Sequence, residues 1–312
     1  MSEAPRPRLS WTALAAFLLA LTTPFLQLLA SVPALFFGLF SLRTINAADG
    51  RMSGRRLAVA ALVVGGAGTL LWGIAFVWMI LLSYCQAAER AACANNLRQL
   101  GLGVSLYADR RGVFPPATFP NPNLVPERRT SWIALILDFV DQKPATDRRF
   151  AEFQARLALD QPWDEPPNLE ASRTVLPFCV CRAHPAGDDL QGRSDYVGLS
   201  GLGLDAATYP GKDPRVGAFG YDRLLRPNEV TGGLTYTLLA METARDNGPW
   251  IAGGPSTVRG LDPDVDEYIG LGRPFGGFHP GGLNTLWMDG RVEFLSDRID
   301  PSVLREQVRV RR

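Results

Sequence analysis

The sequence predicts an α+β protein in which two apolar helices come first and a sheet forms in the second half of the chain. Apolar residues concentrate before residue 89, whereas Pro, Gly and Asp concentrate after it. Two runs, 11–42 and 57–88, contain no charged residue, and each exceeds the roughly 20 residues that span a bilayer. After residue 174, β-rich segments alternate with Gly- and Pro-rich loops, which is typical of a sheet.

The first run is predicted to be a membrane span that follows a polar tail at 1–10. A secretory signal peptide is the alternative, because the run follows a short basic segment. We favour a span, since the run is longer than the roughly 7–15 residues of a signal-peptide core and no small-x-small cleavage site precedes a polar start. Pro24 and Pro33 are expected to kink or divide it.

The loop at 43–56 indicates the orientation of the two spans. It carries four arginines against one acid, namely Arg43, Arg51, Arg55, Arg56 and Asp49. The positive-inside rule puts this loop in the cytoplasm, although Arg6, Arg8, Arg90 and Arg98 favour the opposite orientation. We therefore predict a multi-pass membrane protein with a two-span membrane domain at 11–88 and an extracytoplasmic domain at 89–312.

The second apolar run continues into one long predicted helix at 57–109, which bridges both domains. No proline interrupts it, and Cys93, Leu97, Leu100, Val104 and Tyr107 recur at spacings of four and three, which is one helical face. Gly101 and Gly103 weaken this half by up to about 1 kcal/mol each relative to Ala. We therefore expect tertiary packing to hold it.

The remaining elements are shorter. Helices are predicted at 131–140 and 147–159, and strands at 175–181, 195–199 and 234–242. The clearest signal is a hairpin, in which strands 284–288 and 291–295 flank Asp289-Gly290 as a two-residue turn. This turn pairs Met288 with Arg291, Trp287 with Val292 and Thr285 with Phe294, and assigns Trp287, Val292 and Phe294 to the core.

Residues 12–80 resemble a small two-helix membrane domain family of unknown function. The resemblance lies in Val32-Pro33-Ala34, Gly38, Leu42, Ile45, Gly50, Gly54, Leu57-Ala58-Val59-Ala60 and Gly65. It implies a membrane anchor and no chemistry. Any close-packed helix pair also uses small residues of this kind.

An ordered set of motifs covers about residues 75–305. It comprises Cys93-Ala94-Asn95-Asn96-Leu97-Arg98-Gln99-Leu100-Gly101, Tyr107, Phe114-Pro115-Pro116-Ala117, Ser131-Trp132, Gln142, Trp163-Asp164, Asn168, His279-Pro280-Gly281-Gly282-Leu283-Asn284 and Asp289-Gly290. The set resembles the large prepilin-like family of unknown function with a C-terminal H-x(9)-D-G signature. The resemblance implies a pilin-like fold, in which the second half of the spine helix lies across an antiparallel sheet.

The chain departs from that family at the prepilin leader. A Gly-Phe-Thr-Leu-x-Glu-type site is usual before the hydrophobic helix, whereas Gly68-Thr69-Leu70-Leu71-Trp72 stands here and a predicted span precedes it. We therefore expect no prepilin-peptidase processing, and filament formation is in doubt.

The four cysteines do not have zinc spacing, because Cys179-Val180-Cys181 is not a CxxC and no second pair lies nearby. Outside the cytoplasm, disulfides are permitted. The resemblance implies a disulfide between Cys93 and Cys181, which match the family's two cysteine positions, and its loop would contribute about 4 kcal/mol. The alternatives are Cys179 in place of Cys181, or four free thiols; Cys85 is expected to be free.

The C-terminal family motif is interpreted as structural. Its residues are His279, Gly281, Gly282, Asn284, Asp289 and Gly290. Turn chemistry explains Asp289, and backbone freedom explains the glycines. His279 and Asp289 lie at opposite ends of a strand roughly 30 Å long when extended, so direct contact is not expected.

Asp262, Asp264 and Asp266 form a weak calcium candidate, because carboxylates at alternate positions suit an oxygen-seeking cation. The loop lacks a glycine at its sixth position, and Arg273 stands where the bidentate Glu belongs. A solvated acidic loop is the favoured interpretation, and no metal is predicted.

The predicted function is a structural or assembly role as a membrane-anchored, pilin-like or pseudopilin-like envelope protein. G-x-S-x-G, P-loop and H-E-x-x-H motifs are absent, and the chain has only two histidines, so we expect no enzymatic activity and no cofactor. The net charge of +1 gives no reason to expect nucleic acid, and the expected partners are the lipid bilayer and envelope or secretion-type proteins. The alternative is a binding module that recognises a glycan, peptide or cation through loops 201–278.

Overall fold

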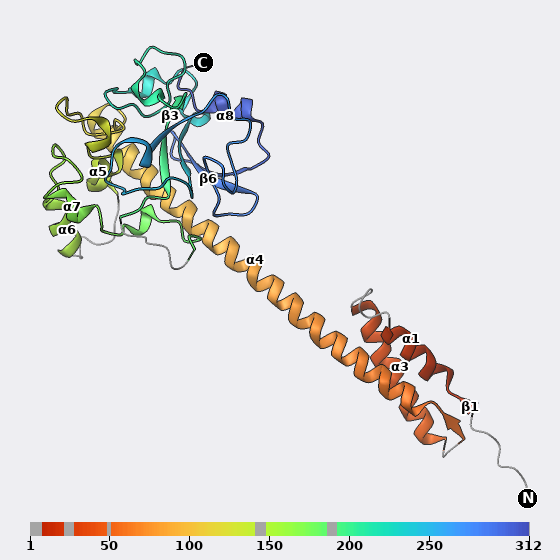
Figure 1. Ribbon diagram of the computed structural model, residues 1–312. Helices are drawn as coiled ribbons and strands as arrows, with labels where there is room; N and C mark the ends of the chain where they lie inside the picture. Colours follow the sequence, from red (N-terminus) through yellow and green to blue (C-terminus); the bar gives the residue numbers. More distant parts are fainter. Residues whose placement is uncertain (1–7, 22–27, 49–50, 141–147, 186–191, 312) are drawn as a thin grey trace, which may run out of the picture. The chain divides into compact units, whose positions relative to one another are not determined.

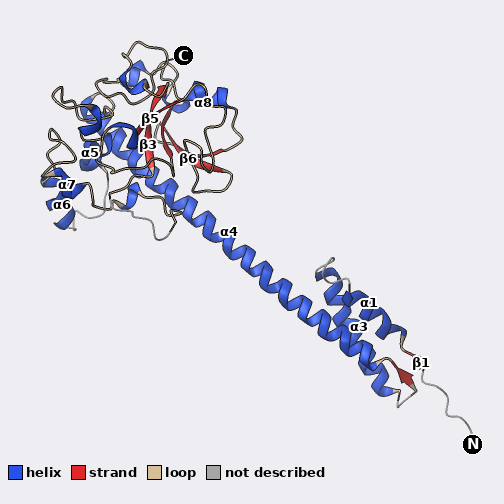
Figure 2. Cartoon of the chain, in the orientation of Figure 1, coloured by secondary structure: helices blue, strands red, loops and turns tan. Residues whose placement is uncertain are grey.

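The computed structural model describes residues 8–21, 28–48, 51–140, 148–185 and 192–311. Its elements confirm an α+β protein with one long apolar helix, α4 (Arg55–Arg111), and a five-stranded sheet (Figure 2). The chain divides into two compact units, 1–85 and 86–312, and the division falls inside α4. Some predictions concern residues outside the described ranges. These residues are 1–7 of the predicted tail, and Pro24, Gln142 and Asp147.

The first unit contains α1 (Trp11–Leu21), α3 (Leu28–Ala47) and the first part of α4. A short parallel pair joins β1 (Arg8–Leu9), which precedes α1, to β2 (Met52–Ser53), which precedes α4. The helices meet through buried small residues, which are Ala13, Ala16, Ala20, Ala34, Ala58 and Ala61. Small side chains let helix backbones approach closely, and the larger apolar side chains of these helices lie on their outer surfaces.

The two predicted spans are not confirmed as such. Within the described residues, α4 alone is both long and apolar enough to cross a membrane. Helices α1 and α3 occupy the described parts of the run that was predicted to be one kinked or divided span at 11–42, and their apolar stretches are shorter than a span. Pro33 lies inside α3 and does not end it.

Helix α4 confirms the predicted spine, with bounds two residues wider at each end than 57–109. Its predicted inner face is correct, since Cys93, Leu97, Leu100 and Val104 are buried. The glycines on it are sites of close approach. A Cβ on Gly101 would lie 2.7 Å from Leu286 Cδ1, and one on Gly103 would lie 2.9 Å from Val140 Cγ2. The helix propensity lost there is offset by contact with the domain.

The sheet has the strand order β5-β3-β4-β6-β7. Its strands are β3 (Tyr196–Leu202), β4 (Leu238–Glu242), β5 (Val258–Leu261), β6 (Gly282–Trp287) and β7 (Val292–Ser296). The expectation of an antiparallel sheet is wrong at one edge, because β5 pairs with β3 in parallel and the other pairs are antiparallel. Strand β5 was not predicted, since Val-Arg-Gly-Leu is too short to show an alternating pattern.

Both faces of the sheet are covered (Figure 1). On one face, Leu97, Leu100 and Val104 of α4 share a core with Ala240 and Leu286. On the other, a second core joins the opposite side chains of the sheet to Leu304 of α8 (Pro301–Gln307) and to the following Val308. On β3 and β6, neighbouring residues face opposite cores, as the pleat of a strand requires; examples are Tyr196 and Val197, and Leu286 and Trp287. On β4, Leu239 and Ala240 both belong to the first core, at the register shift between Leu238 and Ala240.

The predicted hairpin exists, but its register is wrong by one residue. Leu286 pairs with Val292, and Asn284 pairs with Phe294. The loop has three residues, 288–290, closed by the Trp287 N–H donating to the Arg291 carbonyl at 2.9 Å. Gly290 has a φ of +86°, as the last position of such a loop requires. Val292 therefore faces the α4 core, whereas Trp287 faces the second core.

Shorter elements complete the second unit. They are α5 (Trp132–Ile136), α6 (Arg148–Ala155), α7 (Asn168–Ala171) and the 3₁₀ turns Pro126–Arg128, Leu137–Phe139, Pro177–Cys179, Ala206–Thr208, Pro227–Glu229, Leu234–Tyr236 and Gly254–Ser256. The strand predicted at 175–181 is wrong, because Pro177 opens a 3₁₀ turn there. The predicted helix at 131–140 divides after Ile136, and its N-cap Ser131 accepts from two backbone N–H groups.

Candidate functional site

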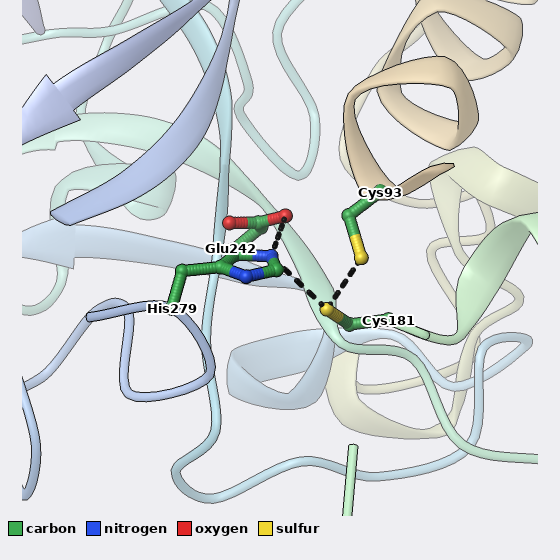
Figure 3. A group of neighbouring side chains, drawn as sticks. All are labelled: Cys93, Cys181, Glu242 and His279. Atoms are coloured by element: carbon green, nitrogen blue, oxygen red, sulfur yellow. Dashed lines mark hydrogen bonds and ion pairs between the residues drawn. The ribbon is translucent and has the colours of Figure 1, made fainter. Parts of the chain in front are cut away.

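Four buried side chains from distant parts of the second unit converge on one point (Figure 3). They are Cys93, Cys181, Glu242 and His279, and their ligating atoms all lie within 4.8 Å of one another. The two sulfurs are 2.6 Å apart, Cys181 Sγ is 3.5 Å from His279 Nε2, and that nitrogen is 3.5 Å from Glu242 Oε1. This thiol–imidazole–carboxylate cluster is the candidate functional site.

Helix α4 and the turn at 177–179 position the two cysteines. Asn96, one turn after Cys93, donates through Nδ2 to the Val180 carbonyl at 2.9 Å and to the Pro177 carbonyl at 3.3 Å. The Arg182 N–H donates to Cys93 Sγ at 3.1 Å. Asn96 therefore fastens the segment that carries Cys181 against the helix that carries Cys93.

A buried carboxylate, Asp195, holds Cys181 from the other side. It accepts the Cys181 N–H at 2.8 Å and the Asn247 Nδ2–H at 2.7 Å, and His184 Nδ1 lies 3.2 Å away. Burial raises the pKa of Asp195 above its usual range, while these partners oppose the rise. This second group supports the backbone of the site without contributing an atom to it.

Glu242 ends β4, and its carboxylate is completely buried. Asn284 on the adjacent β6 holds both of its oxygens, with the backbone N–H donating to Oε2 at 2.6 Å and Nδ2 donating to Oε1 at 2.9 Å. Among the described residues, His279 is the one cation recorded within ion-pair distance of this carboxylate. His279 precedes β6 and is bridged to Gly282, so the β6 entry places it beside the end of β4.

Contacts within the cluster shift the pKa values of Cys93, Cys181 and His279. The hydrogen bond from the Cys181 thiol lowers the pKa of Cys93 to about 4, against the effect of burial, and the same bond raises the pKa of Cys181. Burial disfavours the charged form of His279, but Cys93 and Glu242 together raise its pKa to about 9. A thiolate at Cys93 beside an imidazolium at His279 is the charge state that these contacts favour.

The cluster can do two things chemically. Two sulfurs this close can form a disulfide. Two sulfurs, one imidazole nitrogen and one carboxylate oxygen can also ligate a metal ion. Spacing did not reveal the site, because its residues come from α4, a loop, β4 and the entry to β6. The family resemblance indicated Cys93, Cys181 and the motif that contains His279, whereas no sequence signal indicated Glu242.

The rest of the C-terminal motif has structural contacts. Asp289 accepts the Arg291 N–H at 3.0 Å, as turn chemistry predicts. Gly281 has a φ of +80° with open space beside it. Gly282 does not need a special backbone angle; a Cβ there would meet the Leu295 carbonyl oxygen. Asn284 belongs to the site, since it orients Glu242.

The remaining predicted candidates lie apart from the cluster. Asp262, Asp264 and Asp266 do not bring three ligating atoms together within the part of the chain that the structure describes. Asp262 instead accepts the Asp264 N–H at 3.0 Å in a local turn. Cys85 is exposed, and Cys179 is buried with a pKa raised by that burial.

The fold and the site define an α+β protein with an apolar helix of membrane-spanning length and a buried thiol–imidazole–carboxylate cluster. A family model described as "Protein of unknown function (DUF1559)", labelled SBP_bac_10, matches residues 84–302. The chain therefore belongs to this family. The prediction from the ordered motifs, that the chain is a member of a family of unknown function, is confirmed. The match contains all four residues of the cluster.

No curated protein and no solved structure matches the chain. The family match begins at residue 84 and does not cover residues 12–80. The resemblance of those residues to a two-helix membrane domain therefore stays a prediction.

Proposed function

We propose that this protein is a membrane-anchored, pilin-like component of the cell envelope with a structural or assembly role. The observation that carries the proposal is the two-part character of α4. Its middle, from Leu70 to Leu82, exposes large apolar side chains, whereas its later part buries Leu97 and Leu100 against the sheet.

The apolar surface of the middle part of α4 is unfavourable in contact with water. Ten large apolar side chains there are 36–66% exposed, namely Leu70, Leu71, Ile74, Phe76, Val77, Trp78, Met79, Ile80, Leu81 and Leu82. Burying each contributes about 1.5–3 kcal/mol, so their joint transfer out of water is favourable by on the order of 10 kcal/mol. A bilayer supplies that environment along a helix of this length.

The charge distribution supports an extracytoplasmic second unit. Arg55 and Arg56 stand at the start of α4, immediately before its apolar part. The positive-inside rule favours their retention in the cytoplasm, which would direct residues after 88 to the opposite side. This orientation rests on α4 alone and does not require a second span.

Reporter fusions test the location. Alkaline phosphatase, which is active only outside the cytoplasm, is fused after Arg312, and green fluorescent protein is fused there in a matched chain. We expect an active phosphatase, a dark fluorescent protein and a chain that stays in membranes after alkaline carbonate extraction. A fluorescent, phosphatase-inactive pair would contradict the proposed location.

Photo-crosslinking tests the assembly role. The edge strand β7 offers a row of backbone groups to a partner. A photo-reactive residue at Glu293 in β7 should give discrete crosslinked species in membranes. The control position is Leu271, which is 90% exposed in a loop, and it should give none. Equal crosslinking at both positions, or none at either, would count against an assembly surface on the sheet edge.

The predicted Cys93–Cys181 disulfide belongs to the same proposal, and the adjacency of the two sulfurs supports it. Peptide mapping without reduction should recover the two segments linked when the chain is taken from an oxidising compartment. A Cys179→Ala variant should keep the link and Cys181→Ser should lose it. Linkage through Cys179 would show that the pairing is wrong.

A second candidate, a binding module, is favoured by one cavity. It has a volume of about 410 Å³ and lies within the predicted loops 201–278. Leu204, Val265 and Phe275 give it apolar walls, and Arg245 and Asp262 give it charges of both signs. Cavities of about 300–1,000 Å³ with few polar groups are typical of small-molecule sites.

Ligand-induced stabilisation tests this candidate. The full-length chain is screened in detergent by thermal unfolding against short glycans, peptides and divalent cations. A ligand at 100 times its Kd should stabilise the fold by about 2.7 kcal/mol. Leu204→Trp, which narrows the cavity, should remove the shift, whereas Leu224→Trp on an exposed position outside it should not. A shift that survives Leu204→Trp would place the ligand elsewhere.

A further inference from the structure

We propose that the dithiol form of this protein binds one zinc-class divalent ion through Cys93, Cys181, Glu242 and His279, and that a Cys93–Cys181 disulfide abolishes the site. This inference goes beyond the structural role proposed above and does not depend on it. It requires only the second unit, in which all four residues lie.

The donor set selects the class of metal. Thiolates favour zinc and other soft ions over magnesium or calcium, and an imidazole suits zinc equally well. Four protein ligands of these types are typical of a closed tetrahedral zinc site. All four side chains are buried, so the site has the low exposure of a structural centre and not the open position of a catalytic one.

Two of the distances between ligating atoms match the edges of a tetrahedral zinc site. Zn–S bonds of about 2.3 Å and Zn–N or Zn–O bonds of about 2.1 Å give edges of about 3.6 Å from sulfur to nitrogen and about 3.4 Å from nitrogen to oxygen. The corresponding separations here are 3.5 Å for Cys181 Sγ to His279 Nε2 and 3.5 Å for His279 Nε2 to Glu242 Oε1.

The distance between the two sulfurs distinguishes the metal-bound form from the disulfide form. A tetrahedral zinc site needs about 3.8 Å between sulfurs, whereas Cys93 Sγ and Cys181 Sγ are 2.6 Å apart. Metal binding must therefore move one sulfur outward, and disulfide formation must draw the pair inward. Rotation about the Cα–Cβ bond of either cysteine can change this separation, while Asn96 and Asp195 keep the backbone around Cys181 in place.

The surrounding groups support a metal. Glu242 is buried with both oxygens held by Asn284, which orients the carboxylate before any ion arrives. The Arg182 N–H already donates to Cys93 Sγ. Such outer hydrogen bonds orient ligands and reduce their negative charge in metal sites. A divalent ion would also compensate a buried carboxylate whose one described cationic partner is His279.

The two reactions balance as follows. Binding of Zn²⁺ forms two Zn–S bonds, one Zn–N bond and one Zn–O bond, and it releases two protons, because both sulfurs must be thiolates and the imidazole must be neutral. One proton leaves the Cys181 thiol, and the other is the proton shared by Cys93 and His279, which leaves the imidazolium. Oxidation by a small disulfide such as oxidised glutathione transfers two electrons from the two cysteines, forms their S–S bond and releases two molecules of the small thiol. The same two sulfurs serve both reactions, so the two products exclude each other.

Cobalt provides the direct probe, because Co²⁺ in a tetrahedral thiolate site absorbs visible light whereas Zn²⁺ does not. Full-length protein in detergent is reduced with a phosphine, freed of metal and titrated with Co²⁺. We expect tetrahedral ligand-field bands with a thiolate charge-transfer band, saturation at one ion per chain, and bleaching by one equivalent of Zn²⁺. Protein oxidised with oxidised glutathione should stay colourless.

Variants separate the metal site from the disulfide. His279→Ala and Glu242→Gln should weaken Co²⁺ binding at least about tenfold, as loss of even an outer partner does, while the Cys93–Cys181 link still forms. Cys93→Ser should lose both properties. Cys179→Ala and Cys85→Ser are the matched controls and should keep both. His279→Gln replaces His279→Ala if circular dichroism shows that the latter is unfolded.

Three outcomes would overturn the proposal. The first is a reduced wild-type chain that gives no tetrahedral cobalt spectrum. The second is an unchanged spectrum in folded His279 and Glu242 variants, which would place the ion elsewhere. The third is full Co²⁺ binding by the oxidised chain, which would show that the sulfurs are not ligands.

Discussion

One side chain, Asn96, ties together two segments that are far apart in the chain. Its Nδ2 group contacts the carbonyls of Pro177 and Val180 and the hydroxyl of Tyr196. Each such bond contributes about 0.5–1.5 kcal/mol net, and the two carbonyls would lose this donor if the Asn96 amide were removed. The sequence motif around Cys93 therefore contains a residue that builds the site as well as one that belongs to it.

Asn96→Ala should lower the free energy of unfolding by about 2 kcal/mol, because three acceptors lose their donor. Chemical denaturation of the full-length chain, followed by tryptophan fluorescence, measures the change. Asn95→Ala, on the exposed side of the same helical turn, should stay within about 0.5 kcal/mol. Equal effects of the two substitutions would remove the assigned role of Asn96.

Adjacent glycines in the C-terminal motif should respond differently to the same substitution. Gly282→Ala puts a Cβ into the Leu295 carbonyl of the neighbouring strand and should cost about 1–3 kcal/mol or more, as overpacking does. Gly281→Ala meets open space and should cost only the strain of its positive φ, about 1–2 kcal/mol. Gly281→Asn should recover part of that loss. The opposite ranking in thermal unfolding would contradict this account.

The site could be predicted only in part from the sequence. The sequence predicts the pairing of Cys93 with Cys181 through a family resemblance, and it indicates His279 only as a structural member of the C-terminal motif. Glu242 was not considered, because a glutamate at the end of a strand is ordinary in sequence and becomes informative only when it is buried. Convergence of four segments depends on strand order and on the Cys181 loop, which local patterns do not encode.

At the scale of elements, α4 was predictable because an uncharged apolar run at 57–88 is followed by apolar residues at spacings of four and three, and no proline interrupts either part. The short strands were harder. β5 has four residues and contains Arg259 and Gly260, so it lacks the alternation that marks a half-buried strand. The hairpin turn was recognised from Asp289-Gly290, but this dipeptide fits both two- and three-residue loops, and the three-residue form shifts the register by one.

The apolar part of α4 gives an element-scale prediction. Phe76→Arg combined with Met79→Arg should abolish stable membrane integration, because each arginine costs about 2.5–3.5 kcal/mol at the centre of a spanning helix. Carbonate extraction should then move the chain to the soluble or aggregated fraction.

Arg98→Ala, an exposed change later in the same helix, is the control and should leave the chain in the membrane. Retention of the double arginine variant would mean that α4 is not the anchor.

At the scale of the whole molecule, the two units differ in what holds them together. The second unit has two large cores, one on each face of its sheet, whereas the first relies on alanine contacts among helices. The division at residues 85 and 86 separates the exposed apolar part of α4 from its packed part.

A fragment of residues 86–312 should therefore be soluble, monodisperse and cooperatively folded. The expected result is one sharp thermal transition by circular dichroism and one peak in size-exclusion chromatography. A longer fragment that starts at residue 70 adds the exposed apolar stretch and should aggregate without detergent. A fragment of 86–312 that unfolds gradually would show that the first unit contributes to its stability.

Because the residues of the cluster are far apart in the chain, they leave the ribosome at different times. The two cysteines are 88 residues apart, and His279 follows Cys181 after a further 98. At about 5–20 residues per second, the chain between Cys93 and His279 takes roughly 10–40 s to appear. Throughout that interval the inner face of α4 lacks β6, whose Leu286 packs at Gly101, and the cysteines that Cys93 can meet are Cys85, Cys179 and Cys181. A newly made chain is therefore most open to aggregation and mispairing before β6 arrives.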